Sequence, residues 1–547
     1  MATMTGHRFF AQAMHGYGVT HLFYVNSILP AAMNEIDKAG QVTRVITHGE
    51  KAAAYMADGY SRASRRPGIC MCQDIGTMNL AAGLRDAYMA GSAVIAITGG
   101  QNDEPRYRNA YQNLEDFPVW SAVTKANYSV DSAVRLPDLL RQAFRTATTG
   151  APGPVHLELR GNVGQMLDLE ANYLPLVESA YTHFPAFRPV AETGAIEAAI
   201  AALKKAGKPI IVAGGGAVAS GAGAEVIQLA ELLSIPIATS LQAKALVPDG
   251  HPLAVGVPGS YSRSCANKAV AAADLVFFIG SHTGGQVTNG WQTPKVGTPV
   301  IQLDIEPAEL GRNYPNVASM HGDAKASLQK MIALVGAAAL SRTAWLTEVQ
   351  GYVRDFWVES EPLRQSADMP MRPERMCKEL QEWLPSDATV VVDTFHAALW
   401  TAQMMRLKAG QNYLRCAGSL GWGFPATLGA KAAMPNKPVI GFVGDAGFYY
   451  HMAELETAAR IGVNAVVVVN NNHAGGVAES ADFHAAVNFA KVAESMGCFG
   501  VRVERPEAIR GAMDKALASG RPAVVEIISD KNVKAQRGWV PPSISAE

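Results

Sequence analysis

Short apolar runs alternate with segments of helical periodicity along most of the chain. In the first third, these runs predict five β-strands, at residues 19–25, 44–46, 68–72, 93–97 and 154–159. Strands that alternate with helices predict a parallel sheet with helices packed on both faces. We therefore expect the first third of the chain to form a doubly wound α/β domain.

The same alternation restarts twice. A polar, proline-containing stretch at 179–189 predicts a linker, and a charged helical segment at 345–364 predicts a connector. Apolar runs recur after these two segments, at residues 209–213, 235–239, 274–280 and 299–304, and then at 390–393, 441–443, 466–469 and 524–528. We predict three doubly wound parallel-sheet domains of the α/β class, at 1–180, 190–340 and 365–530. The tail at 531–547 has no periodicity, and the sequence leaves open whether it is disordered or folds over an active site.

The composition is that of a globular protein with an ample core, because 48% of the residues are hydrophobic and 17% are charged. A formal net charge of −1 gives no reason to expect a nucleic acid or a membrane as partner. The six cysteines include no pair at a metal-ligand spacing. Residues 1–17 contain no apolar signal core, and no run reaches the roughly 18 apolar residues of a membrane span. We expect a cytoplasmic protein with reduced thiols.

One pattern near the end of the chain predicts a magnesium site. Gly444-Asp445-Ala446 follows an apolar run at 439–443, and Asn472 follows the next predicted strand, after a helix at 451–461. A single βαβ unit therefore brings Asp445 and Asn472 to adjacent strand ends, where α/β sheets bind ligands. Their carboxylate and amide oxygens, together with a backbone carbonyl and diphosphate oxygens, are the hard ligands that Mg2+ prefers.

A purely structural interpretation of this pattern is also open. Asp445 could cap the helix that follows it, and asparagine is common in turns after a strand. The three asparagines at 470–472 leave the register of the pattern open, and counting from both Asp445 and Gly476 favours Asn472. A second pattern, far upstream, favours the magnesium interpretation.

Glu50 stands where the predicted strand at 44–46 passes into a helix of small residues. The helix dipole alone would stabilise an acid at this place. However, the run Glu-x-x-Ala-Ala-x-x-Ala-Asp-Gly-Tyr-x-Arg, which begins at Glu50, closely resembles the pyrimidine-binding domain of thiamine diphosphate enzymes of the acetohydroxyacid synthase, benzoylformate decarboxylase and pyruvate oxidase superfamily. The pattern around Asp445 resembles the diphosphate-binding domain of the same superfamily.

Further matches to this superfamily cover nearly the whole chain. They lie in a glycine-rich loop with its following strand (76–99), in a Tyr-Gln-Asn segment (111–116), at the end of the middle domain (304–311) and in a loop near the cofactor (418–426). The resemblance implies a pyrimidine-binding, a central Rossmann-like and a diphosphate-binding domain. It also implies a homodimer or homotetramer with active sites between subunits, because Glu50 and Asp445 would come from different chains.

The resemblance assigns roles to individual residues. Glu50 would hydrogen-bond the N1′ atom of the cofactor's aminopyrimidine, which then removes the C2 proton of the thiazolium ring. Leu420 would support the bent cofactor, and a plain core leucine is the alternative. Gln112 would hold an oxygen of the substrate, and a surface turn is its alternative.

The remaining expected site residues bind the metal and the diphosphate. The resemblance implies Mg2+ ligation by Asp445, by the side chain of Asn472 and by the carbonyl of Ala474. The other expected cofactor-binding residues are Asn79, His396, Gly418, Gly444, Ala446, Gly447 and Gly476.

Several positions depart from the synthase pattern. Gly49 stands where the synthases have a histidine, and residues 73–79 place Asp74 in the glycine-rich loop. We therefore expect a substrate other than two pyruvates. Residues 281–286 replace the Arg-Phe-Asp-Asp segment with which the synthases hold FAD, which argues against a bound FAD. The glycine run at 214–216 could cradle a nucleotide phosphate, or could serve only as a strand-to-helix turn.

The sequence thus predicts a thiamine diphosphate- and Mg2+-dependent enzyme that makes or breaks a carbon–carbon bond next to a carbonyl, through an ylide and an enamine. An acetolactate synthase-like carboligase on 2-oxo acids is the leading expectation. The alternatives are a 2-oxo acid decarboxylase, a 2-hydroxyacyl or diketone lyase, a flavin-dependent oxidase and a non-catalytic relative.

Overall fold

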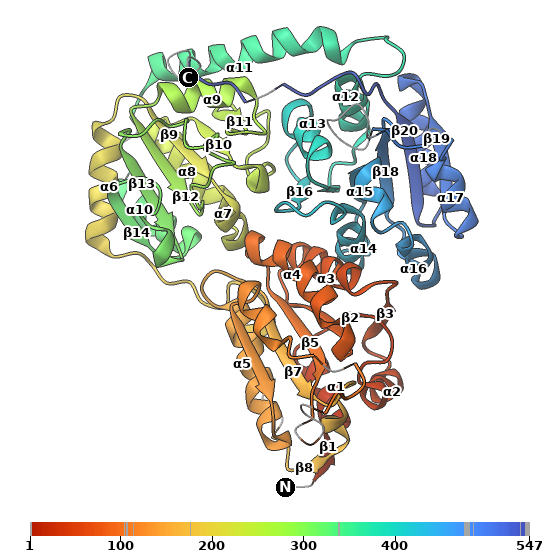
Figure 1. Cartoon of the computed structure of the whole chain (residues 1–547). Helices are drawn as coiled ribbons and strands as arrows, with labels where there is room; N and C mark the ends of the chain where they lie inside the picture. Colours follow the sequence, from red (N-terminus) through yellow and green to blue (C-terminus); the bar gives the residue numbers. More distant parts are fainter. Residues whose placement is uncertain are drawn as a thin grey trace.

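Three six-stranded parallel sheets form the protein (Figure 1). The computed structural model describes residues 3–102, 104, 108–112, 114–174, 177–336, 340–474, 482–484, 486–536 and 538–541. Helices cover both faces of each sheet, and the three sheets follow one another along the chain. The predicted fold class, three doubly wound α/β units, is confirmed.

The first sheet has the strand order β3-β2-β4-β5-β7-β6. Its strands are β2 (His21–Tyr24), β3 (Thr43–Ile46), β4 (Gly68–Cys72), β5 (Val94–Gly100), β6 (Ala126–Val130) and β7 (Val155–Arg160). The helices around it are α1 (Gly6–Gly16), α2 (Pro30–Ala39), α3 (Glu50–Ser64), α4 (Thr77–Ala90) and α5 (Leu136–Thr148). A separate antiparallel pair joins β1 (Met4–Thr5) to β8 (Glu170–Ala171).

The third sheet repeats this topology, with the order β16-β15-β17-β18-β20-β19. Its strands are β15 (Thr389–Val392), β16 (Asn412–Arg415), β17 (Val439–Gly444), β18 (Val466–Asn471), β19 (Phe499–Val503) and β20 (Ala523–Ile528). Its helices are α12 (Pro373–Trp383), α13 (His396–Met404), α14 (Gly423–Ala433), α15 (Asp445–Tyr449), α16 (Glu454–Ile461), α17 (Phe489–Ser495) and α18 (Ile509–Ala518). In both sheets the first strand lies between the second and the third. Ligand crevices are therefore expected between β2 and β4 and between β15 and β17.

The central sheet differs, with the order β11-β10-β9-β12-β13-β14. Its strands are β9 (Pro209–Ala213), β10 (Ile237–Thr239), β11 (Ala254–Gly256), β12 (Leu275–Ile279), β13 (Val300–Asp304) and β14 (Asn316–His321). Its helices are α6 (Thr193–Lys205), α7 (Gly215–Ser220), α8 (Gly223–Leu233), α9 (Ser264–Ala272) and α10 (Ala324–Val335). This is the Rossmann strand order, in which ligands bind where β9 and β12 diverge.

The structure adds edge strands that the apolar runs did not predict, namely β6, β11, β14, β16 and β19. Buried and more exposed positions alternate in β11, β14 and β16, whereas only the last residue is buried in β6 and in β19. Central parallel strands, in contrast, are buried on both faces and appear as continuous apolar runs. The helix predicted at 451–461 begins later, as α16, and a separate short helix, α15, precedes it.

Helices α3 and α14 join the first and third units through direct backbone contact. A Cβ atom on Gly59 would lie 2.2 Å from the carbonyl oxygen of Ala426, and one on Gly429 would lie 1.9 Å from that of Met56. Any side chain at these two positions would therefore push the helices apart. The glycines fix how closely the two units approach.

The long helix α11 (Thr343–Arg364) connects the central unit to the third unit and packs on α9. The chain after β20 runs back across both units (Figure 1). Gln403 donates a hydrogen bond to the carbonyl of Gln536, and Asn267 donates one to the carbonyl of Trp539. The described part of the tail is therefore docked along α13 and α9.

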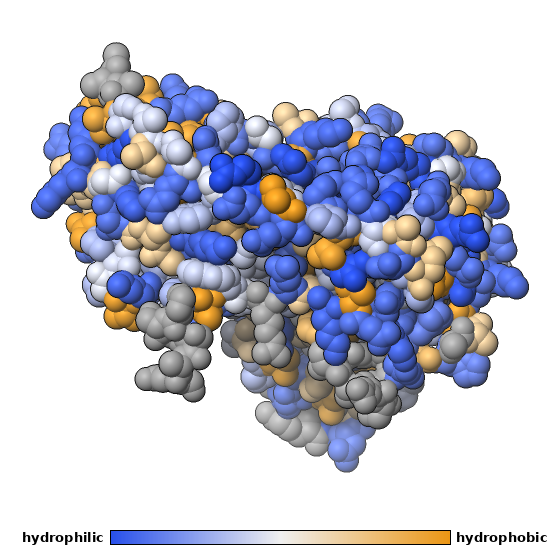
Figure 2. Space-filling view, turned by 90° about the horizontal axis from the view of Figure 1, so that it is seen from above, coloured by the Kyte–Doolittle hydropathy of each residue, from blue (hydrophilic) through white to orange (hydrophobic). Residues whose placement is uncertain are grey.

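No helix in the described part of the chain is both long and apolar enough to cross a membrane. On the face seen in Figure 2, hydrophobic residues are scattered among hydrophilic ones. All six cysteines are buried and free.

Candidate functional site

Asp445 lies at the carboxyl edge of the third sheet, at the first position of α15. Its side chain belongs to a residue that is only 4% exposed, and Oδ1 accepts the backbone N–H of Ala446 at 2.8 Å. Oδ2 is buried and has no hydrogen-bond partner among the described residues. Burial raises the pKa of Asp445 to about 6, although nearby backbone N–H groups, including those of residues 472–474, oppose the shift. A buried carboxylate oxygen without a partner fits a bound cation.

The three asparagines after Val469 have different surroundings. The Oδ1 atom of Asn470 accepts from Ser529 at 2.6 Å, and the Nδ2 atom of Asn471 donates to Glu526 at 2.7 Å. Asn472 follows the end of β18, and its Oδ1 atom accepts the N–H of Ala474 at 3.1 Å. The first two side chains are thus held by residues at the end of β20 and just after it, which leaves Asn472 as the candidate beside Asp445.

The described residues contain no cluster of three or more His, Cys, Asp or Glu side chains that could hold a metal. A cation beside Asp445 would therefore need amide, carbonyl and ligand oxygens to complete its shell. The carbonyl of Ala474 belongs to this loop, whereas Gly476 lies outside the described residues.

Asp393, at the end of β15, connects the loops that surround the third-sheet crevice. Its carboxylate accepts the N–H groups of Gly421 at 3.1 Å and of Gly423 at 3.3 Å. A Cβ atom on Gly447 would lie 2.6 Å from Asp393 Oδ2 and 3.5 Å from Leu420 Cδ1. Burial raises the pKa of Asp393 to about 7. Gly447, two residues after Asp445, is therefore a neighbour of Leu420 at this edge.

The turn between β15 and α13 holds an unusual aromatic residue. Phe395 has φ 56° and ψ −123°, a region that residues other than glycine avoid, and is 40% exposed. Its ring stacks on the imidazole of His396 with centroids 4.4 Å apart. Burial, followed by Lys534, lowers the pKa of His396. His396 opens α13 at this crevice. No local pattern in the sequence marks Phe395.

The loop at 416–422 is held from the first unit of the same chain. The buried Asp86 carboxylate accepts the N–H groups of Ala417, Gly418 and Ser419, at 2.8, 3.1 and 3.0 Å. Trp422 donates its indole N–H to Asp58 at 2.8 Å. The exposed Gly418 and the half-buried Leu420 are thus presented by a loop with a fixed backbone.

Glu50 begins α3 at the carboxyl edge of the first sheet. Asn79 donates a hydrogen bond to Glu50 Oε2 at 3.3 Å, and a Cβ atom on Gly76 would lie 2.7 Å from Glu50 Oε1. Two residues earlier, the N–H of His48 donates to Glu454 at 2.9 Å, and its ring lies 2.8 Å from Glu456. The turn that carries Glu50 is therefore held by the start of α16.

Gln112 reaches the same edge in a left-handed conformation, with φ 63°. Its Oε1 atom accepts from Asn162 Nδ2 at 2.8 Å, and the carbonyl of Asn162 accepts the N–H of Asp74 at 2.9 Å. Burial, followed by the charges of Asp116 and Glu158, raises the pKa of Asp74 to about 7. Sequence reasoning missed Asn162, since nothing local marks it.

The expected residues thus fall into two groups, one at each sheet edge. Glu50, Asn79 and Gln112 lie at the first sheet; His396, Leu420, Asp445, Asn472 and their loops lie at the third. In the described part of the chain, no hydrogen bond or ion pair joins Glu50 to Asp445 or Asn472.

Three family profiles match the chain in order. They are the thiamine pyrophosphate enzyme N-terminal TPP binding domain over residues 4–118, the central domain over 196–331 and the C-terminal TPP binding domain over 394–527. Each of the three matches falls on one of the sheets.

Similar proteins align over almost their full length. A probable acetolactate synthase large subunit of Methanocaldococcus jannaschii is 31% identical over 514 residues, which are 89% of this chain and 86% of the relative. The acetolactate synthase large subunit of Parasynechococcus marenigrum is 28% identical, over 96% and 88% of the two chains. The glyoxylate carboligase of Escherichia coli O157:H7 is also 28% identical, over 95% and 92%.

Proposed function

The chain belongs to the thiamine pyrophosphate enzyme family, and we propose that it is a magnesium- and thiamine diphosphate-dependent carboligase acting on a 2-oxo acid. The carboligase assignment draws on relatives described as acetolactate synthases and as a glyoxylate carboligase. The cofactor site draws chiefly on one observation, the buried Asp445 oxygen without a partner at the crevice of the third sheet.

The residues around Asp445 suit the metal and the diphosphate. Asp445, the Asn472 amide and the Ala474 carbonyl would coordinate Mg2+. Around the diphosphate, the binding residues would be Gly444, Ala446, Gly447, His396 and Gly418. Leu420, beside Gly447, would support the ring system, and Asn79 would act together with Glu50.

Thiamine diphosphate supplies, when bound, a carbon nucleophile and an electron sink. Glu50 would hold a proton at the aminopyrimidine N1′ atom, and Gln112 would hydrogen-bond a carbonyl oxygen of the substrate. In the overall reaction, the bond between the carboxylate carbon and the carbonyl carbon of the 2-oxo acid breaks, and CO2 leaves. The acyl carbon then bonds to the carbonyl carbon of an acceptor, whose oxygen takes a proton.

Asp74 favours a second candidate, a 2-oxo acid decarboxylase or a carbon–carbon lyase. Its carboxyl stands in the loop whose Gly76 lies against Glu50, a loop that carries no acid in the synthase pattern that the chain resembles. An added acid at this edge would alter the binding of a second anionic substrate.

Two copies of the chain would form the active site, because Glu50 and Asp445 lie in separate groups of residues within one chain. We therefore propose a homodimer, or a homotetramer built from such dimers.

Product analysis tests the proposal. The protein is supplied with Mg2+, thiamine diphosphate and pyruvate or glyoxylate, with and without an aldehyde acceptor. Acetolactate, tartronate semialdehyde or another acyloin as the main product supports a carboligase. Free aldehyde as the sole product identifies a decarboxylase, and cleavage of acyloins or 2-hydroxyacyl compounds identifies a lyase. Conversion of the substrate with neither release of CO2 nor formation or cleavage of a carbon–carbon bond would reject the proposal.

A further inference from the structure

Asp74 carries a buried carboxyl group without a partner. It begins a short 3-10 turn (Asp74–Gly76) directly after β4 and is only 4% exposed. In the part of the chain that the structure describes, its carboxyl group makes no hydrogen bond and no ion pair. Buried polar groups are normally hydrogen-bonded, and an exception near a site points to a ligand.

Two further polar atoms beside Asp74 lack a partner among the described residues. One is Oγ1 of Thr77, which is 2% exposed, and the other is the buried Oδ1 atom of Asn162. Both residues are bonded to the backbone of Asp74: the Thr77 N–H donates to its carbonyl, and the Asn162 carbonyl accepts its N–H at 2.9 Å. A carboxyl, a hydroxyl and an amide oxygen together offer a ligand both donors and acceptors.

These residues lie against the two groups of the first sheet that the proposed function uses. Asn162 Nδ2 donates to Gln112 Oε1 at 2.8 Å, and Gln112 would hold the substrate oxygen. At the end of the turn that Asp74 begins, a Cβ atom on Gly76 would lie 2.7 Å from Glu50 Oε1. A single loop therefore connects Asp74 to the residue proposed for the substrate and to the one proposed for the aminopyrimidine.

The ionisable groups around Asp74 are mostly acids. Burial, followed by the charges of Asp116 and Glu158, raises the pKa of Asp74 to about 7, and the charge of Asp74 in turn helps to raise the pKa of the buried Cys72 thiol. Arg160 follows Glu158 on β7, and its Nη1 atom donates to a backbone carbonyl just after β5 at 3.2 Å. Below pH 7 the Asp74 carboxyl is mainly neutral and has an O–H group to donate.

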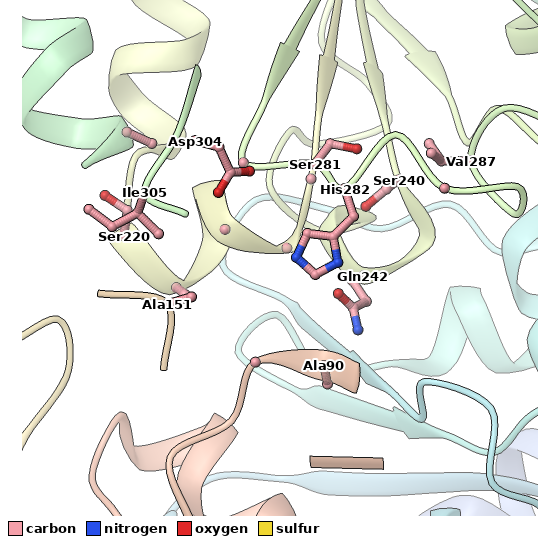
Figure 3. Close-up of a pocket in the computed structure, with 18 of the residues that line it drawn as sticks. Ala90, Ala151, Ser220, Ser240, Gln242, Ser281, His282, Val287, Asp304 and Ile305 are labelled. Carbon is pink, nitrogen blue, oxygen red and sulfur yellow. The ribbon is translucent and has the colours of Figure 1, made fainter. Parts of the chain in front are cut away.

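The group around Asp74 is separate from the cavity of about 460 Å3 that Figure 3 shows. That cavity takes residues of the first unit from the end of α4, among them Ala90. Thr77 begins the same helix, whose 14 residues span about 20 Å. A ligand of Asp74 therefore binds at the carboxyl edge of the first sheet and not in that cavity.

The acids around Asp74 suit an uncharged acceptor. A second 2-oxo acid would bring another carboxylate close to Asp116 and Glu158, and like charges disfavour one another. An aldehyde adds no charge, and its carbonyl oxygen accepts a hydrogen bond from a neutral carboxyl group. A hydroxyl group on the aldehyde would also satisfy the Oδ1 atom of Asn162.

We propose that Asp74 is a catalytic acid, which gives its proton to the carbonyl oxygen of an aldehyde acceptor. A bond forms between the acyl carbon of the donor and the carbonyl carbon of the aldehyde. The π electron pair of the aldehyde moves to its oxygen, which takes the proton of Asp74, and water returns a proton to the carboxylate. This inference rests on the proposed carboligase function and names its acceptor.

Competition between acceptors tests the proposal on the full-length protein with Mg2+ and thiamine diphosphate. Pyruvate or glyoxylate serves as donor, with acetaldehyde or glycolaldehyde at the same concentration. We expect the wild type to form at least tenfold more product from the aldehyde acceptor than from a second 2-oxo acid. Equal or greater use of the 2-oxo acid as acceptor would overturn the proposal.

Asp74→Asn keeps the size of the side chain but has no proton to give. The donor should still lose CO2, whereas the ratio of acyloin to free aldehyde derived from the donor should fall at least tenfold. Asp131→Asn, exposed after β6, is the matched control and should keep the ratio of the wild type. If Asp74→Asn does not fold, the smaller and neutral Asp74→Ser takes its place. An unchanged ratio in the folded variant contradicts the proposal.

The pH dependence separates a proton donor from a merely structural residue. In the wild type, the ratio of acyloin to free aldehyde should fall by up to about tenfold per pH unit above pH 7, as Asp74 ionises. The ratio in Asp74→Asn should not change over this range. A wild-type ratio that is constant from pH 6 to pH 8 would refute the role of Asp74.

Infrared spectroscopy gives a readout that does not depend on turnover. The difference spectrum of wild type minus Asp74→Asn, without thiamine diphosphate, should show a neutral carboxyl band that disappears as the pH rises from 6 to 8. A band absent at pH 6 would refute the proposal. If no 2-oxo acid releases CO2 although this band is present, the proposed function fails, and the catalytic role of Asp74 fails with it. If turnover is normal and the band is absent, only the role of Asp74 fails.

Discussion

The Arg62 guanidinium and the Asp86 carboxylate form a buried ion pair, with Nη2 and Oδ1 2.9 Å apart. Asp58 shares the same guanidinium, and Asp86 also holds the backbone of the loop at 417–419. The pair therefore links helices α3 and α4 to the third unit. A carboxylate with several N–H donors and a cation is well compensated for its burial.

Asp86→Asn should loosen the loop at 416–422. The amide keeps the shape but accepts fewer of the three backbone N–H groups, so we expect weaker thiamine diphosphate binding by about tenfold, or about 1.4 kcal/mol. The melting temperature should also fall. Asp355→Asn, at an exposed ion pair with Arg354, serves as control. Cofactor titration by fluorescence measures the change, and unchanged affinity would show that the loop does not depend on Asp86.

Glu50→Gln should abolish proton removal but leave cofactor binding nearly intact. Glutamine has the same size, and Asn79 can still bond to its amide oxygen, but it cannot exchange a proton with the aminopyrimidine. General acid–base groups contribute about 10²–10⁴-fold in rate. Exchange of the thiazolium C2 proton in deuterated buffer is the measurement. Glu35→Gln, on the surface of α2, should exchange like the wild type, and rapid exchange in Glu50→Gln would remove Glu50 from the mechanism.

Removal of the metal should release the cofactor. With excess chelator, the wild type should lose thiamine diphosphate, and Mg2+ should restore it. Asn472→Ala should raise the Mg2+ concentration needed for half-saturation at least tenfold, because one oxygen ligand is lost. Asn532→Ala, exposed in the tail, is the control. A variant with the Mg2+ requirement of the wild type would shift the assignment to another residue of the loop.

Asp74 should make the wild type less stable as the pH rises from 4 to 7. Its pKa of about 7 in the folded protein exceeds the ordinary 3.8, so between these values the unfolded chain is ionised and the folded one is not. The free energy of unfolding then falls by at most about 1.4 kcal/mol per pH unit from this group.

The variant Asp74→Asn isolates this effect. The difference in unfolding free energy, variant minus wild type, should grow between pH 4 and pH 7 and stay constant above that range. Asp116, whose pKa burial raises to about 6, remains in both proteins; because its charge also raises the pKa of Asp74, the difference reports Asp74 together with this interaction. Denaturant titrations at several pH values measure the two unfolding free energies. A difference between them that does not change across this pH range would mean that Asp74 ionises normally.

The centres of the sheets could be predicted because buried parallel strands are continuous apolar runs. The run at 68–72 coincides with β4, and the run at 209–213 with β9. The edge strand β14 alternates buried and exposed residues, so it lacks that signal. Where an edge strand forms depends on the neighbouring strand, which only the folded chain provides.

The same limit applies to the site. Glu50 and Asp445 stand in short local patterns, so their positions at strand ends follow from the sequence. Asp86, however, holds a loop more than 300 positions away. Such partners share no local spacing. Phe395 also escaped prediction, because its backbone strain follows from the turn and not from the residue type.

The bare backbone contact of α3 with α14 limits how the molecule can move. Two helices whose backbones touch at Gly59 and Gly429 cannot slide or hinge on one another without breaking that fit. Any motion that admits substrate and expels product must then occur outside this contact. Substituting alanine at Gly59 would therefore lower the stability and would also increase the distance between the first and third units.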